Sequence, residues 1–80
     1  MRSTPTEAAD IEIALLRDVA AGLVEDDADF TPMLLVDGER VSVAQSIWAL
    51  ERRRLVEQPF TSRVWQLTDA GRAVLEEADR

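Results

Sequence analysis

Residues 65–75, "WQLTDAGRAVL", change their pattern of apolar side chains at Thr68. Before this position Trp65 and Leu67 alternate with polar residues, which is typical of a β-strand. After it the apolar residues recur at helical spacing, and threonine is a residue type that caps helix N-termini. We therefore expect a strand that leads directly into a helix, the two covering residues 64–67 and about 69–79. The helix is expected to turn three residues inward: Ala70, Val74 and Leu75.

A second helix is expected before this strand. Ser42 and Gln45 have the spacing of a capping box, in which two side chains satisfy the first backbone N–H groups. The helix should run to about Arg53. One stripe of it should face inward: Val43, Ile47 and Leu50. Residues 55–58 then fit another strand, and Pro59 starts the loop that follows it.

The N-terminal segment predicts a longer helix over about 5–21. Thr4, Pro5 and Glu7 form a capping box with proline at the first helical position, where its missing N–H is tolerated. Its inward face should carry Ile11, Leu15 and Val19, widened by Ile13 and Leu16. Residues 23–24 fit a short strand. The acidic run after them reads as a solvated loop: Glu25, Asp26, Asp27 and Asp29.

Residues 31–38 allow two interpretations. Asp37-Gly38 between apolar runs is a strong hairpin signal, because both residue types tolerate positive φ. Thr31 followed by Pro32 is also typical of the start of a short helix that ends at Gly38, and a helix here is what a helix-turn-helix motif requires. We favour the hairpin, and the short helix is the alternative.

Length and composition limit the class of protein. A chain of 80 residues is enough for one small domain, 1–80. It has no cysteine and no histidine, which removes the usual metal ligands and the commonest general base near neutral pH. With no phosphate-binding glycine loop and no nucleophile beside a base, we expect neither an enzyme nor a bound cofactor or metal. The absence of a membrane-length apolar run or a signal peptide predicts a cytoplasmic protein.

The net charge of −7 is unevenly distributed. Residues 1–40 hold ten acidic residues and three arginines, whereas residues 41–80 hold six of each. Four arginines of the second half have few acidic neighbours in the sequence: Arg52, Arg53, Arg54 and Arg63. An acidic body argues against polyanionic partners and a local basic strip argues for one. Charge alone therefore leaves both a solvated surface and a binding surface open.

Residues 41–75 resemble the winged helix-turn-helix family, most closely the C-terminal half of MarR- and PadR-like regulators. In that family a recognition helix ends in a leucine, a charged stretch and "GLV", a two-stranded wing follows, and "LTDAGR" starts the closing helix. Three residues match the first motif: Leu50, Leu55 and Val56. Residues 67–72, "LTDAGR", match the second, where Gly71 should let the helix pack closely on the sheet. Arg54 stands where the family usually has a left-handed glycine. The compact form is also similar to small winged-helix proteins of actinobacteria and their phages.

The resemblance implies an α+β fold, a small winged helix of three helices with a two- to three-stranded antiparallel wing sheet. It implies a regulator of transcription that binds double-stranded DNA as a homodimer. On the exposed face of the recognition helix, Gln45 suits adenine and Arg52 suits guanine or phosphate. Phosphate contacts are expected from Arg53, Arg54 and Arg63.

A different function fits the same helix. Trp48, with Ala44 and Ala49 beside it, reads base edges poorly but anchors protein contacts well, since tryptophan is enriched at interface hot spots. The alternative is therefore a protein-interaction or dimerisation module centred on Trp48, with the acidic residues 25–29 as a second contact. A third interpretation folds Trp48 back into the core, which is also the place expected for Trp65.

Overall fold

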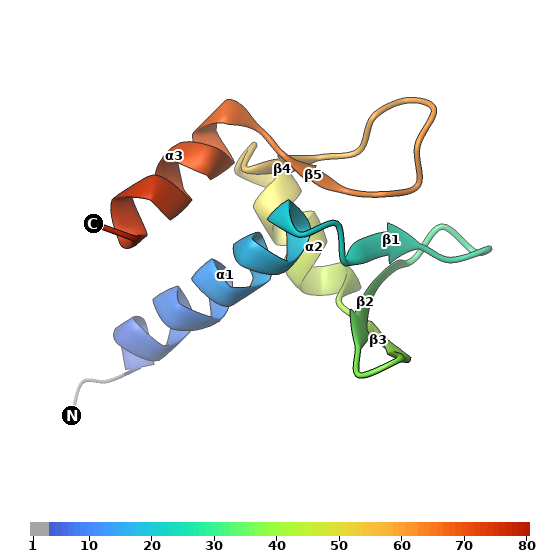
Figure 1. Cartoon of the computed structure of the whole chain (residues 1–80), viewed down its shortest axis with the longest axis horizontal. Helices are drawn as coiled ribbons and strands as arrows, with labels where there is room; N and C mark the ends of the chain where they lie inside the picture. The colour runs from blue at the N-terminus through green and yellow to red at the C-terminus, as the bar shows by residue number, and fades with distance from the viewer. Residues whose placement is uncertain (1–3) are drawn as a thin grey trace.

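Residues 4–80 are described by the computed structural model, with side chains described from Asp10 onward. They form an α+β domain of three helices and two antiparallel sheets. Helix α1 (Thr4–Ala20) precedes the strands β1 (Val24–Asp26), β2 (Pro32–Val36) and β3 (Glu39–Ser42). Then come α2 (Ala44–Arg52), β4 (Val56–Glu57), β5 (Gln66–Leu67) and α3 (Asp69–Ala78). The start of α1 and the C-terminus lie on one side of the molecule, and the β1–β2 and β4–β5 loops project on the opposite side (Figure 1).

Strand β1 is the edge strand of the β1–β2–β3 sheet, and it forms backbone hydrogen bonds along both of its edges. On one edge it pairs antiparallel with β2. On the other edge, the Asp26 N–H donates to the Arg63 carbonyl and the Trp65 N–H donates to the Val24 carbonyl, each at 2.9 Å. The strand expected at residues 23–24 instead covers Val24–Asp26. Its backbone joins the first half of the chain to the second.

The segment between α1 and α2 is the β2–β3 hairpin, which confirms the favoured interpretation. Asp37 and Gly38 have φ of 52° and 83°, the left-handed conformation that a two-residue type I′ turn requires. No helix stands between α1 and α2 in residues 4–80, so the second helix of a helix-turn-helix is missing from this part of the chain. Ser42 pairs with Met33 in the hairpin, so its expected role as the cap of α2 is wrong. Val43 takes that position without a side-chain cap.

Helix α2 ends in a Schellman motif built around Arg54. The N–H of Leu55 donates to the Leu50 carbonyl at 3.0 Å, and the N–H of Arg54 donates to the Glu51 carbonyl at 2.9 Å. Arg54 has φ of 63°, the conformation in which the family places glycine. An L side chain there costs about 1–2 kcal/mol, so this helix end carries strain.

Thr68 caps α3, as expected. Its hydroxyl accepts a hydrogen bond from the Gly71 N–H at 3.0 Å and donates to the Arg54 carbonyl at 2.6 Å, which ties α3 to the end of α2. Gly71 is buried, and a Cβ there would lie 2.0 Å from the carbonyl oxygen of Leu55. The expected close packing is confirmed. The inward position expected for Ala70 is wrong, because Gly71 takes it and leaves Ala70 exposed.

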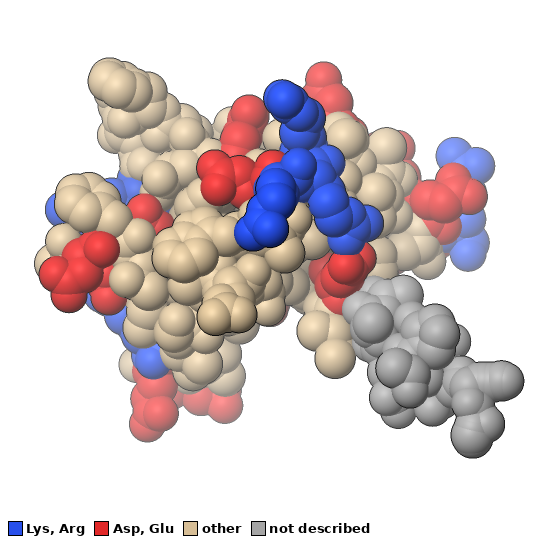
Figure 2. All heavy atoms as spheres, turned by 180° about the vertical axis from the view of Figure 1, so that it is seen from behind, with Lys and Arg blue, Asp and Glu red and all other residues tan. Residues whose placement is uncertain are grey.

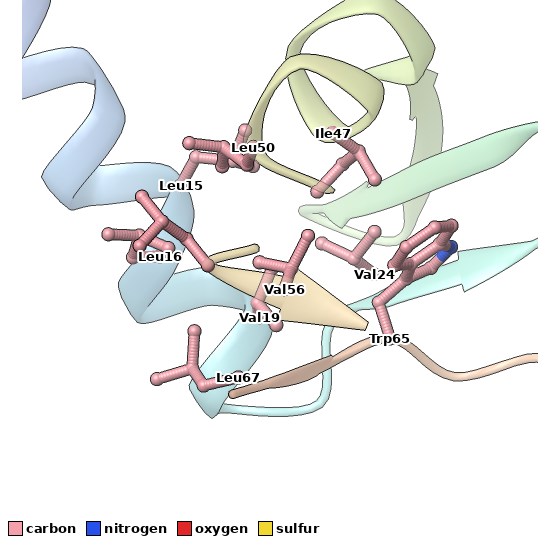
Figure 3. Close-up of a cluster of buried hydrophobic side chains, with 10 residues drawn as sticks. Leu15, Leu16, Val19, Val24, Ile47, Leu50, Val56, Trp65 and Leu67 are labelled. Carbon is pink, nitrogen blue, oxygen red and sulfur yellow. The ribbon is translucent and has the colours of Figure 1, made fainter. Parts of the chain in front are cut away.

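The core lies where α1, α2 and the strands meet (Figure 3). Ten buried side chains form it: Leu15, Leu16, Val19, Val24, Ile47, Leu50, Leu55, Val56, Trp65 and Leu67. Trp65 is 4% exposed, as expected for a core residue. Ile11 was expected to face inward but is 66% exposed, because the inward face of α1 is buried only from Leu15 onward. The capping box expected at Thr4 and Glu7 involves side chains outside the described ones.

Regular strand pairing in the second sheet is shorter than the sequence suggests. Only Val56–Glu57 and Gln66–Leu67 pair as β4 and β5, whereas strands were expected over 55–58 and 64–67. Residues 63–65 bond to β1 instead. None of the described helices is both long and apolar enough to cross a membrane.

Replacing Arg54 by glycine should stabilise the protein. Glycine adopts positive φ without the clash of an L side chain, so Arg54→Gly should raise the free energy of unfolding by about 1 kcal/mol. Urea unfolding followed by tryptophan fluorescence measures the change. Ala49→Gly, which places a glycine inside α2, is the control and should lower stability by about 1 kcal/mol. A loss of stability in Arg54→Gly would contradict the strain at this helix end.

Candidate functional site

The exposed side of α2 carries the residues that the sequence places there. Gln45, Trp48, Ala49 and Arg52 are exposed, and Ala44 is half-buried. Trp48 is 43% exposed, so the interpretation that it folds into the core is wrong. Gln45, Ala49 and Arg52 recur every three or four residues and lie on one side of the helix, with about 10 Å along the axis between the first and the last. We call the five residues Ala44, Gln45, Trp48, Ala49 and Arg52 the α2 face.

An apolar hollow borders the α2 face. It measures about 160 Å³ and lies between α1 and α2, lined by Ile11, Glu12, Leu15, Ser46, Ala49 and Leu50. Among its lining residues only Glu12 is charged. Such a surface suits a protein contact better than a phosphate backbone.

Three consecutive arginines stand at the end of α2: Arg52, Arg53 and Arg54, here called the arginine group. Arg52 also belongs to the α2 face. All three are exposed. Arg53 Nη1 lies 2.6 Å from Glu12 Oε2, whereas Arg52 and Arg54 have no ion-pair partner among the described side chains. On the face shown in Figure 2, the largest group of basic side chains lies near the middle, next to carboxylates and a broad uncharged surface.

Arg63 does not join the arginine group. It lies in the β4–β5 loop (residues 58–65), on the side of β1, and its backbone carbonyl accepts from the Asp26 N–H at 2.9 Å. It precedes Gln66, the first residue of β5, by three residues, a span of about 10 Å at the rise of a strand. The four arginines that are close in the sequence therefore form one group of three and one separate side chain.

Asp26 is a buried polar residue beside the core, a role that the sequence pattern did not predict. It is 7% exposed. Its Oδ1 accepts from Trp65 Nε1 at 2.8 Å, and its Oδ2 accepts from Gln58 Nε2 at 2.8 Å. Two donors compensate a carboxylate removed from water. The available signal was strand alternation, because Val24 and Asp26 share one face of β1.

The remainder of the acidic run shapes the β1–β2 loop. Asp27 Oδ1 accepts from the N–H groups of Asp29 and Thr31 at 2.9 and 3.0 Å. The expectation of a solvated acidic loop is therefore wrong for Asp26 and incomplete for Asp27. No group of three or more acidic side chains in the described part of the chain is arranged to hold a metal ion.

Removing the Asp26 carboxylate should loosen the attachment of the β4–β5 loop. Asp26→Ala leaves the Trp65 N–H buried without its acceptor, and should lower the free energy of unfolding by about 1–3 kcal/mol. Asp29→Ala, an exposed aspartate three positions away, is the control and should change it by less than about 0.5 kcal/mol. Urea unfolding measures both. Equal stability of Asp26→Ala and the parent protein would contradict this role.

Comparison with known protein families, with curated protein sequences and with solved structures finds no match to this chain. The candidate binding surfaces are therefore the α2 face, the arginine group and the loops. These are the surfaces that the fold leaves outside the core.

Proposed function

We propose that the protein binds double-stranded DNA through the α2 face and the arginine group, as a cytoplasmic regulator of transcription. The observation that carries the proposal is the position of the arginine group, exposed at the end of a surface helix. Residues 44–54 hold three arginines and one glutamate, so this surface is basic on a chain of net charge −7. Gln45 and Arg52 lie on one side of α2 and suit adenine and guanine edges in the major groove.

The element order supports a winged-helix architecture of a modified kind. A helix, a short strand, a surface helix, a strand, a protruding loop, a returning strand and a closing helix follow one another as in that family. The β2–β3 hairpin replaces the second helix. In this proposal α2 takes the place of the recognition helix and the β4–β5 loop that of the wing. Arg63 then reaches a phosphate some distance from those held by the arginine group.

The ion pair between Arg53 and Glu12 does not prevent Arg53 from binding a phosphate. Both side chains are about half exposed, at 54% and 43%. Exposed pairs of this kind contribute about 0–1 kcal/mol, less than a charge-assisted contact to a phosphate gains. Arg52 and Arg54 have no ion pair among the described side chains that DNA would have to displace. Arg53, Arg54 and Arg63 therefore supply three phosphate contacts, which the salt dependence of binding should report.

Binding to a labelled mixed-sequence duplex tests the proposal. Three phosphate contacts predict that affinity falls roughly 40-fold between about 50 mM and 200 mM NaCl. Arg54→Ala should weaken binding and reduce the slope of log affinity against log salt by about 1. Arg80→Ala, which removes the same charge beyond the end of α3, is the control and should leave the slope unchanged. Fluorescence anisotropy at several salt concentrations measures both quantities.

Absence of binding even at low salt would overturn the proposal, since the acidic body then dominates the arginine group. A slope that Arg54→Ala and Arg80→Ala change equally would also overturn it, because the attraction to DNA would then not be specific to the arginine group. Trp48→Ala is expected to matter less than Arg52→Ala.

A second function is favoured by the exposure of Trp48. An exposed tryptophan between two alanines, beside an apolar hollow, is the composition of a protein interface core. Three more exposed apolar side chains belong to the neighbouring hairpin: Leu35, Val36 and Val41. In this alternative the α2 face binds a second copy of the chain or another protein.

Self-association measured by sedimentation equilibrium tests this alternative. If the α2 face is a dimer interface, Trp48→Ala should weaken dimerisation at least about tenfold, because buried tryptophan anchors contribute most of an interface's energy. Val64→Ala, an exposed apolar residue of the β4–β5 loop, is the control. A monomer at all concentrations would contradict the dimer.

A further inference from the structure

An open apolar groove lies between α1 and α3. The two helices pack beside each other on the side of the molecule that holds the C-terminus (Figure 1). The groove measures about 540 Å³, compared with about 160 Å³ for the hollow beside the α2 face. Six residues line it, four of them apolar: Asp10, Ile13, Ala73, Val74, Glu77 and Ala78. We call these six residues the α1–α3 groove.

Ile13 and Val74 form the floor of the α1–α3 groove, because both are half-buried and pack against the core. The other apolar lining residues, Ala73 and Ala78, are exposed and small, so they leave room above this floor. The ion pair between Arg17 and the aspartate that ends α3 joins the two helices. The walls of the groove are therefore held by the core and by this pair.

The spacing of the lining residues matches a helical partner. On α1 the lining positions 10 and 13 are three residues apart, and on α3 they form two rows with a spacing of four, 73–77 and 74–78. Residues at these spacings are neighbours along one side of a helix. A groove bounded by two helices fits a third helix, whose apolar side chains at positions i, i+4 and i+7 enter it.

Both charged residues of the α1–α3 groove are carboxylates. Asp10 has no ion-pair partner among the described side chains. Glu77 Oε1 lies 4.0 Å from Arg80 Nε, and the two side chains are 78% and 75% exposed, so this pair costs little to displace. Lysine or arginine side chains beside the apolar row of a bound helix therefore meet two available carboxylates.

A second copy of the chain fits this groove poorly. The described side chains of α1 and α3 include six carboxylates and two arginines. Two such surfaces placed against each other repel, since like charges then face one another. Phosphate groups are repelled for the same reason. The charges of the two helices therefore favour a cationic partner.

We propose that the α1–α3 groove binds an amphipathic helix of a partner protein, one with an apolar row flanked by lysine or arginine. The apolar row packs on Ile13 and Val74, and the cationic side chains pair with Asp10 and Glu77. The groove shares no residue with the α2 face, the arginine group or the β4–β5 loop, so the proposal does not rest on DNA binding.

A titration of the ¹⁵N-labelled full chain with synthetic helical peptides tests the proposal. The probe carries leucine at positions i, i+4, i+7 and i+11 and lysine on both sides of this row. One comparison peptide has the same composition in scrambled order, and in the other glutamate replaces lysine. We expect the probe to shift the amide resonances of residues 10–14 and 73–78, and both comparison peptides to bind at least about fivefold more weakly.

Removing both carboxylates of the groove tests the charge pairing. Asp10→Asn combined with Glu77→Gln should weaken binding of the probe at least about threefold, as expected for two exposed ion pairs. Asp29→Asn combined with Glu76→Gln is the matched control. It makes the same change in net charge at two exposed positions that do not line the groove, and should leave binding within about twofold of the parent.

Ala73→Lys tests the groove itself. It places a cationic side chain among the lining residues, one turn from Glu77, and should weaken the probe at least about fivefold, although it changes the net charge by only half as much as the control. Because position 73 is an exposed helical position, the variant should keep the parent's unfolding midpoint.

Equal binding by either comparison peptide, equal weakening by the two double variants, or shifts centred outside the groove would overturn the proposal. Resonances of the groove that shift with protein concentration in the absence of peptide would also overturn it, and would identify a second copy of the chain as the occupant.

Discussion

The two backbone hydrogen bonds between β1 and residues 63–65 are the constraint on which the other parts of this structure depend. Strand β1 is three residues long, yet both of its edges are bonded, one to β2 and one to the last residues of the β4–β5 loop. These bonds place Trp65 beside Asp26, and the side-chain hydrogen bond between them then fixes the loop. A buried carboxylate that accepts from an indole N–H is costly to disturb, since neither group has water as a substitute. Core, hairpin and loop are in this way coupled through one short strand.

Patterns that are local in the sequence predicted most of the secondary structure. The Thr68 cap, the Asp37-Gly38 turn and the inward stripe of α2 depend on residues within a few positions of one another, and all are present. The errors concern residues whose environment is set by distant partners. Ser42 has the spacing of a cap, but its pairing with Met33 draws it into a strand. Asp26 reads as a loop residue until Trp65, 39 positions away, supplies its donor.

The candidate site shows the same division. Exposure of Gln45, Trp48 and Arg52 follows from the periodicity of one helix, so it could be predicted. The separation of Arg63 from the arginine group could not, because it depends on how far the β4–β5 loop extends and on which strand receives it. The hollow between the β1–β2 and β4–β5 loops was also missed, since Phe30 and Phe60, which both line it, are 30 positions apart and each looks like an ordinary apolar residue. Only the joining of the two loops through β1 brings their rings to one hollow.

The two-sided bonding of β1 also has a consequence for biosynthesis. On the ribosome the chain emerges N-terminus first, so α1 and the β2–β3 hairpin can form while the second half is still being made. Until Trp65 has emerged, however, one edge of β1 has no partner and the Asp26 carboxylate has no indole donor. A nascent or truncated chain that stops before this point exposes Val24, Ile47 and an open strand edge, the features that promote aggregation. The domain therefore acquires its stable fold only when nearly all of it has been synthesised.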